Sequence, residues 1–209
     1  MKAVIFDFGG VLINIDYQAP RLAFEALGYQ AFGNSYSQAE QQEVFDWLET
    51  GKISATQFYD EMRRLSGLSL SNEQIRQAWD SILLDLPDDR LALLPQLKQA
   101  GIACFLLSNT NQLHIETIYQ GLMERGIHDF PSNFNKVYLS YECGLRKPDE
   151  SFFQLLLEEH QLSPQDCLFI EDSPQHRTTA RQLGIHAPDH ATNDNPLPIL
   201  RAYLPEVFG

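Results

Sequence analysis

Short apolar runs alternate with longer amphipathic stretches along most of this chain, and this alternation constrains the fold more than any other feature. The apolar runs predict four strands, at residues 2–8, 102–107, 136–140 and 167–170. Continuous apolar runs are typical of strands that are buried on both faces, as in a parallel sheet. The amphipathic stretches predict helices at residues 88–100, 111–125, 149–160, 175–183 and 196–204. Strands that alternate with helices indicate an α/β fold with a doubly wound, mainly parallel sheet.

The alternation stops between residues 14 and 87, where the sequence shows no convincing strand. One helix is expected near residues 18–27. Capping-box patterns mark three further helix starts, at Ser37, Ser54 and Ser71. We therefore expect a helical cap at residues 14–87, inserted into a core that is made of residues 1–13 and 88–209. Asp88 is the expected cap of the first core helix.

The charge balance limits the classes of partner. Fifteen Lys and Arg residues face 28 Asp and Glu residues, which gives a net charge of −13. Nucleic acids and anionic membranes both require a basic surface, so neither is an expected partner. An anionic small molecule is disfavoured too, unless a local positive group reverses the field.

Three observations bear on location. No apolar run approaches the roughly 18 residues of a membrane helix. The N-terminus does not resemble a signal peptide, because Asp7 interrupts its short apolar run. Cys104, Cys143 and Cys167 are scattered, as is typical of reduced thiols in a cytoplasmic protein. We therefore expect a cytoplasmic protein, and the sequence sets no oligomeric state.

Polar residues follow each predicted strand. Because ligands bind beyond the carboxyl ends of the strands in open α/β sheets, these residues are expected at one edge. They are Asp7 and Gly9, Ser108 and Asn109, Arg146 and Lys147, and Glu171 and Asp172. Taken singly, Asp7 or Ser108 is explained as a turn or helix cap, and Lys147 as a solvated loop residue. The adjacent carboxylates of Glu171 and Asp172 repel at a buried strand end unless a cation is present, and Asp7 with Asp172 offers oxygen ligands that suit Mg²⁺.

These strand ends resemble the four motifs of the haloacid dehalogenase superfamily. The matching residues are Asp7 in VIFDFGGVL, Ser108 in FLLSNTN, Lys147 in GLRKPD, and Glu171 and Asp172 in LFIEDS. The motifs occur in the family's order, and the helical insertion corresponds to the family's cap. Within the superfamily, the chain is most similar to small sugar-phosphate phosphatases with a helical cap and to the phosphatase domain of soluble epoxide hydrolases. The resemblance implies a Rossmann-like core and Mg²⁺-dependent hydrolysis of a small phosphorylated metabolite, such as a sugar phosphate.

The resemblance also implies the roles of the acidic residues. Asp7 would be the nucleophile and would form an aspartyl-phosphate intermediate. The Mg²⁺ ion would bind to Asp7, to the backbone oxygen of Gly9 and to Asp172. Glu171 would act on the metal indirectly, through a neighbouring group or a water molecule.

The remaining motif residues would bind the substrate. The Ser108 hydroxyl and the backbone N–H of Asn109 would hold phosphate oxygens. Lys147 would orient Asp7 and stabilise charge on the transferring group. Arg146, next to it, is the candidate contact for another anionic group of the substrate.

Two positions depart from the family pattern. Most phosphatases of the family carry a second Asp two residues after the nucleophile, which protonates the leaving group, and this chain has Gly9 there. General acid–base help is typically worth ~10²–10⁴ in rate. Asp16, His114 and His176 are the candidates for a substitute, and His176 also stands where many members have Asp or Asn.

Two other functions stay open at this point. A 2-haloacid dehalogenase attacks carbon without a metal and without the second Asp, but the Glu171–Asp172 pair favours a cation. The other alternative is a non-enzymatic binding or regulatory protein. The joint presence of four motif residues argues against it: Asp7, Ser108, Lys147 and Asp172.

The cap is expected to contact the substrate. Trp47, Arg63 and Arg64 are the candidate contacts. The pattern that Trp47 forms with Val44 and Leu48 is, however, typical of a core position.

Overall fold

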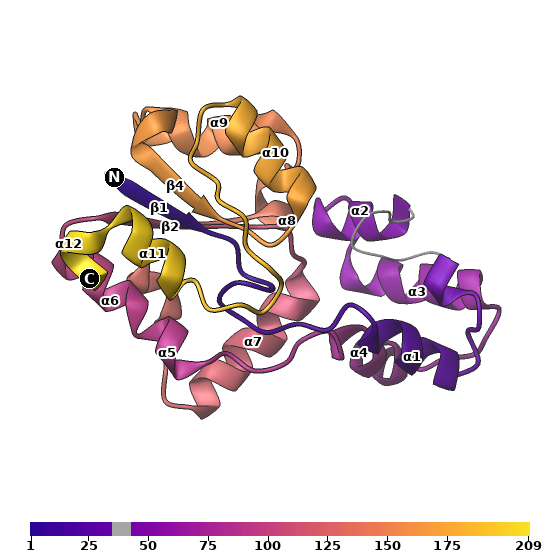
Figure 1. Ribbon diagram of the computed structural model, residues 1–209. Helices are drawn as coiled ribbons and strands as arrows, with labels where there is room; N and C mark the ends of the chain where they lie inside the picture. Colours follow the sequence, from indigo (N-terminus) through magenta and orange to yellow (C-terminus); the bar gives the residue numbers. More distant parts are fainter. Residues whose placement is uncertain (35–42) are drawn as a thin grey trace.

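The computed structural model describes residues 1–34 and 43–209 and contains an α/β core beside a group of helices (Figure 1). The sheet has four parallel strands in the order β3-β2-β1-β4. They are β1 (Ala3–Phe6), β2 (Ala103–Ser108), β3 (Lys136–Leu139) and β4 (Cys167–Ile170). In the register of β1, Ala3 lies opposite Ala103 of β2 on one side and Cys167 of β4 on the other. The predicted doubly wound parallel sheet is confirmed.

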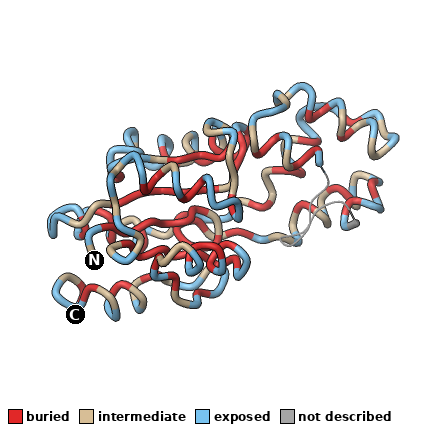
Figure 2. Tube along the Cα trace, turned by 90° about the horizontal axis from the view of Figure 1, so that it is seen from above, coloured by how far each residue is buried: buried red, intermediate tan, exposed pale blue. Residues whose placement is uncertain are grey.

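Both faces of the sheet are buried, as the continuous apolar runs predicted (Figure 2). Val4, Phe6 and Leu106 belong to the apolar cluster on one face, whereas Ile5 and Phe105 belong to the cluster on the other. The first cluster is covered by α6 (Leu93–Gln99), α7 (Gln112–Glu124), α11 (Leu197–Tyr203) and α12 (Pro205–Phe208). The second is covered by α9 (Glu150–Glu159) and α10 (Pro174–Gln182).

Between residues 14 and 87, the described part of the chain is mainly helical, with a linker at each end. Its helices are α1 (Ala19–Ala26), the 3₁₀ turn η1 (Phe32–Asn34), α2 (Glu43–Glu49), α3 (Ala55–Ser66) and α4 (Asn72–Asp80). Complete capping boxes begin α3 at Ser54 and α4 at Ser71, as predicted, whereas the box expected at Ser37 lies outside the described residues. We keep the term cap for residues 14–87, and these bounds stay a prediction. In the described part of the chain, no helix combines the length and hydropathy that a membrane span needs.

The cap is joined to the core by two adjacent linkers and by α4. Ile15 and Leu83 form an antiparallel bridge between the linkers. On α4, the Trp79 ring stacks on His114 of α7 with the ring centroids 4.9 Å apart. Arg76 donates to the Leu113 carbonyl of α7 over 2.6 Å. These contacts fix one side of the cap against the core.

One predicted helix differs from the observed structure, and proline explains the difference. The stretch 88–100 contains two helices, α5 (Asp88–Leu91) and α6, because Pro95 has no N–H to donate to the carbonyl four residues earlier. The N-cap of α5 is Pro87, so the cap role expected for Asp88 is wrong. The helix predicted at residues 196–204 is observed as α11, and the sequence did not predict α12, which begins at Pro205. The sequence did not predict α8 (Ser140–Cys143) or the 3₁₀ turns η2 (Phe130–Asn133) and η3 (Pro164–Asp166).

Candidate active site

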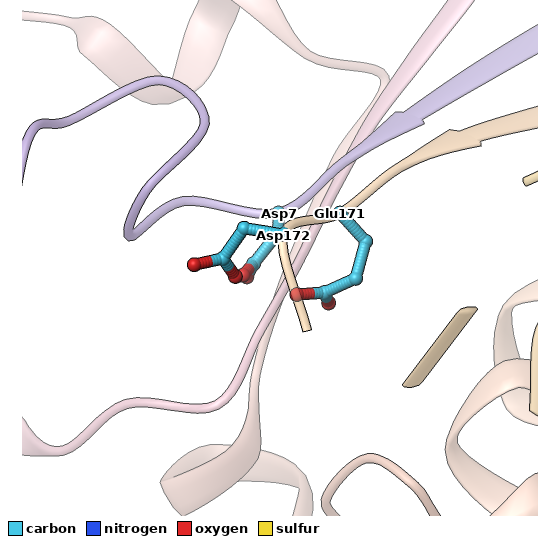
Figure 3. A group of neighbouring side chains, drawn as sticks. All are labelled: Asp7, Glu171 and Asp172. Carbon is cyan, nitrogen blue, oxygen red and sulfur yellow. The ribbon is translucent and has the colours of Figure 1, made fainter. Parts of the chain in front are cut away.

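The strand order brings the two acidic strand ends together. The order of strands reverses between β1 and β4, and ligands bind at such a switch point in open α/β sheets. Asp7 follows β1 directly, and its backbone N–H donates to the Ile170 carbonyl at the end of β4 over 2.9 Å. Figure 3 shows the side chains of Asp7, Glu171 and Asp172 leaving these neighbouring strand ends with their carboxylates close together.

The three carboxylates form a buried cluster. One oxygen of each lies within 4.8 Å of the others. Asp7 is 8% exposed, Asp172 is 5% exposed and Glu171 is fully buried. The turn after β1 passes so close that a Cβ on Gly10 would lie 2.6 Å from Asp172 Oδ2. Gly10, which has a φ of +75°, is therefore required both by the conformation and by the close approach.

Lys147 supplies the positive charge that balances part of this cluster. Its side chain is fully buried, and Nζ lies 2.8 Å from Asp7 Oδ1 and 2.6 Å from Glu171 Oε2. The ammonium group thus bridges the carboxylates that follow β1 and β4. The solvated-loop explanation of Lys147 is wrong.

The acid pKa values are shifted in opposite directions within the cluster. Burial and the charge of Glu171 raise the pKa of Asp7 well above its usual range, against the effect of Lys147. Burial and the charge of Glu171 also raise the pKa of Asp172 to about 7. Burial would raise the pKa of Glu171 as well, but Lys147 and His176 hold it well below its usual range. Lys147 therefore stabilises the ionised form of Glu171, whereas burial and the charge of Glu171 outweigh the effect of Lys147 on Asp7.

Asn109 holds the backbone of Lys147 in place. Its Nδ2 donates to the Lys147 carbonyl over 2.7 Å, and its Oδ1 accepts from the Lys147 N–H over 2.8 Å. The Asn109 side chain thus binds the backbone of Lys147. Phosphate binding by the Asn109 backbone N–H stays a prediction. Ser108, which ends β2, is 2% exposed. The N-cap of α7 is Asn111, so neither Ser108 nor Asn109 serves as a helix cap.

A cavity of about 100 Å³ opens above the cluster and is lined by both core and cap residues. The core contributes most of the predicted site: Asp7, Gly9, Ser108, Asn109, Arg146, Glu171 and Asp172. Glu49 and Ile82 of the cap also line it, together with Tyr17 and Leu83. Lys147 is not among the lining residues, so in this arrangement it acts on the cavity through Asp7 and Glu171.

Arg146 connects the core to α2 of the cap. Its guanidinium forms ion pairs with Asp46 and with Glu49, the latter with Nη2 2.9 Å from Oε2. A direct contact of Arg146 with an anionic substrate group would compete with both carboxylates. The substrate role of Arg146 stays a prediction, and the observed role is to hold the cap at the cavity.

The three acid–base candidates lie in different environments. Asp16 is exposed, and its side chain accepts from the Gln18 N–H. His114 lines the cavity, but burial lowers its pKa to about 4. His176 also lines the cavity, and its Nδ1 lies 3.1 Å from Glu171 Oε2. His176 is thus the candidate that contacts the carboxylate cluster.

The cap candidates do not form the cavity wall. Trp47, Arg63 and Arg64 are not among its lining residues. The core position expected for Trp47 is wrong, because this residue is 37% exposed while Val44 and Leu48 are buried. Arg63 pairs with Asp60, and Arg64 with Glu61, on the same helix.

Sequence reasoning missed several residues that hold the site. Glu49 gives no signal beyond its position near a helix end. Arg177 of α10 donates to the backbone carbonyls of both Glu171 and Asp172, over 2.9 and 2.6 Å. The sequence did offer a signal for Arg177, because it lies five residues after Asp172 in the helix predicted to follow that strand end. Thr192 contacts Asp172 from the C-terminal segment, and no local pattern marks it.

The donor set fits a hard divalent cation. Such ions bind carboxylate and backbone oxygens, and Mg²⁺ uses one or two carboxylates in most sites. Asp7 and Asp172 are buried together, and burial and the charge of Glu171 raise the pKa of both, so an added positive charge would favour their ionised forms. A cation between them would supply it.

Comparison with known proteins places this geometry in a family. The chain is 28% identical over 184 residues to the D-ribitol-5-phosphate phosphatase of Bacteroides thetaiotaomicron, with 88% of this chain and 89% of the relative covered. It is 27% identical over 191 residues to a sesquiterpene phosphatase of Aspergillus oryzae, with 88% and 87% covered. A crystal structure of a haloacid dehalogenase family enzyme from B. thetaiotaomicron, in complex with magnesium and inorganic phosphate, superposes with a TM-score of 0.83. That enzyme is 31% identical, and the match covers 93% of this chain and 96% of the other.

The family model for haloacid dehalogenase-like hydrolases matches residues 1–184, which include all four strands and the whole carboxylate cluster. The suspected resemblance is thereby confirmed. The chain belongs to the haloacid dehalogenase-like hydrolase family.

Proposed function

We propose that this protein is a Mg²⁺-dependent phosphatase that hydrolyses a small phosphomonoester through an aspartyl-phosphate intermediate on Asp7. The observation that carries the proposal is the meeting of Asp7, Asp172 and Lys147 at the switch point of the sheet. Phosphatase relatives and a magnesium and phosphate complex of a family member support it. The substrate is a small phosphorylated metabolite of the cytoplasm, and no nucleic acid is involved.

In the first step, a carboxylate oxygen of Asp7 attacks phosphorus. The new bond joins Asp7 to the phosphoryl group, and the bond from phosphorus to the leaving alkoxide breaks. Lys147 holds Asp7 Oδ1 in place, and the Ser108 hydroxyl and the Asn109 backbone N–H bind phosphoryl oxygens. In the second step, water attacks phosphorus and the bond to Asp7 breaks, which releases phosphate.

Asp7, Asp172 and the backbone oxygen of Gly9 would hold Mg²⁺, and Glu171 would act on it indirectly. When bound, Mg²⁺ supplies the positive charge that lets the anionic nucleophile and an anionic phosphoryl group approach each other. Lys147 stabilises the ionised form of Glu171 and contacts Asp7 at Oδ1, and the oxygen donors to the cation would come from Asp7 and Asp172.

The cavity favours a small substrate with both polar and apolar parts. Arg146 and Glu49 provide polar groups to the lining, while Ile82 and Leu83 provide apolar surface. A sugar or polyol phosphate would place its hydroxyl groups toward the Arg146–Glu49 pair. The D-ribitol-5-phosphate phosphatase relative supports this class.

The proposal is tested on a panel of sugar, polyol and isoprenoid phosphates with Mg²⁺, beside 2-chloropropionate as a dehalogenase substrate. We expect phosphate release from at least one sugar or polyol phosphate and no chloride release. Chloride release without phosphate release would overturn the proposal in favour of a dehalogenase. Release of neither would favour the non-enzymatic alternative.

Gly9→Asp is expected to raise the rate of phosphate release. The substitution restores a carboxyl group that can protonate the leaving group, and such acid–base help is worth ~10²–10⁴ in other enzymes. A Cβ at Gly9 would lie 3.3 Å from the flexible Ile15 Cδ1, so the side chain fits after a small shift. The measurement is kcat for the best substrate of the panel.

Gly9→Asn is the matched control, because it adds nearly the same volume but cannot act as a general acid. A rate increase in Gly9→Asp alone supports the missing-acid explanation. An unchanged rate in a folded Gly9→Asp protein would contradict it and show that protonation of the leaving group does not limit turnover.

A further inference from the structure

A segment near the C-terminus crosses the turn that follows β1. We call residues 190–193 the C-terminal strap; in Figure 1 the gold chain between α10 and α11 contains it. Arg177 Nη1 donates to the His190 carbonyl over 3.1 Å. The Asn193 N–H donates to the Gly10 carbonyl over 2.8 Å. The Asn193 side chain bonds both backbone groups of Ile15, over 2.9 and 2.8 Å.

The strap delivers one hydroxyl group to the carboxylate cluster. Thr192 Oγ1 donates to Asp172 Oδ2 over 2.7 Å. The packing around this contact is tight, because a Cβ on Gly10 would lie 2.6 Å from the same oxygen and 3.2 Å from Thr192 Cγ2. The turn after β1, the end of β4 and the strap therefore meet at the Asp172 carboxylate.

We propose that Thr192 is a positioning residue whose hydroxyl fixes the orientation of the Asp172 carboxylate for Mg²⁺. The inference rests on the proposed function. The terminal torsion of an aspartate side chain is broad, so a hydrogen bond to one oxygen selects one orientation of the other. Hydrogen bonds of this kind to metal ligands typically contribute 10–100-fold to metal affinity or activity. The family model ends at residue 184, so the strap lies outside the matched segment.

The strap does not depend on Thr192 for its own position. Arg90 Nη2 donates to the Asn193 carbonyl over 2.5 Å, and Nη1 donates to the Val11 carbonyl over 2.9 Å. Asn193 and Arg177 add the contacts described above. Loss of one hydroxyl group from the exposed Thr192 therefore leaves the strap attached and the fold intact.

The test compares Thr192→Val, which removes the hydroxyl at nearly constant volume, with Thr192→Ser, which retains it. Mg²⁺ binding is measured by titration calorimetry on the substrate-free protein, and the Mg²⁺ concentration for half-maximal activity is measured separately. Thr178→Val is the matched control, because the exposed Thr178 hydroxyl donates to the Pro174 carbonyl on α10 over 2.8 Å.

We expect Thr192→Val to raise the Kd for Mg²⁺ by about tenfold. We expect Thr192→Ser and Thr178→Val to remain close to wild type, and the thermal unfolding of all variants in EDTA to coincide. Equal Mg²⁺ affinity of Thr192→Val and wild type would overturn the inference alone. A loss in Thr192→Ser as large as in Thr192→Val would also overturn it. Absence of Mg²⁺ binding by the wild type would overturn both the inference and the proposed function.

Discussion

Asp7→Asn is expected to lower kcat by about 10⁴-fold or more, the size of loss that removal of a nucleophile causes in other enzymes. The amide cannot form the aspartyl-phosphate, although it has nearly the same shape as the carboxylate. The fold is expected to persist. Because burial and Glu171 raise the pKa of Asp7, the ionised carboxylate is an unfavourable group in the metal-free protein, and the amide removes its charge.

The measurement is kcat beside thermal unfolding in EDTA. Asp60→Asn is the matched control, since Asp60 lies on α3 and pairs only with Arg63 among the ion pairs of the described residues. This control is expected to keep wild-type activity. Activity of Asp7→Asn within tenfold of wild type, in a preparation free of wild-type protein, would remove Asp7 from the role of nucleophile.

Lys147→Met is expected to lower both activity and stability. The ammonium group contacts Asp7 and Glu171 at 2.8 and 2.6 Å, and its removal leaves both carboxylates without this partner. Breaking a buried ion pair by removing one member typically costs about 3–5 kcal/mol. Loss of one preorganised electrostatic group in an active site typically lowers kcat by about 10²–10³.

The stability deficit of Lys147→Met is expected to grow as the pH rises. Without the ammonium group, Asp7 and Glu171 bind protons more tightly in the folded than in the unfolded protein, so stability is lost as the pH rises through their folded pKa values. Chemical denaturation at pH 5 and pH 8 measures this. Adding Glu171→Gln to Lys147→Met is expected to recover part of the loss. Equal deficits at both pH values, with no recovery, would contradict the account of the buried cluster.

The fold followed from the sequence where a local pattern determines the structure. The run of residues 167–170 is apolar at every position, and β4 has these bounds. Ser54 and Ser71 begin helices because each capping box is completed within four residues. Prediction failed where the burial of a side chain depends on how its helix packs against other elements. On α2, the buried face is set by Val44, Phe45 and Leu48, and Trp47 lies beside that face.

The location of the site at one edge of the sheet was predictable from the parallel arrangement of the strands. Parallel strands bring their carboxyl ends to one edge, so Asp7 and Asp172 were expected at the same edge once the strands were recognised. Their close approach also depends on the strand order, which places β4 beside β1. The Arg146–Glu49 ion pair was not predictable, because it depends on how the cap helix α2 lies against the core. Thr192 was not predictable because the strap reaches Asp172 through a loop path that no periodicity describes.

Dependence on a divalent cation is tested by measuring phosphate release by the wild-type protein, from its best phosphomonoester substrate, before and after removal of divalent cations. EDTA is expected to reduce the rate to background, and excess Mg²⁺ to restore it. The reason is that Asp7 and Asp172 require a cation between them to act as proposed. Full activity in the chelated protein would contradict the account.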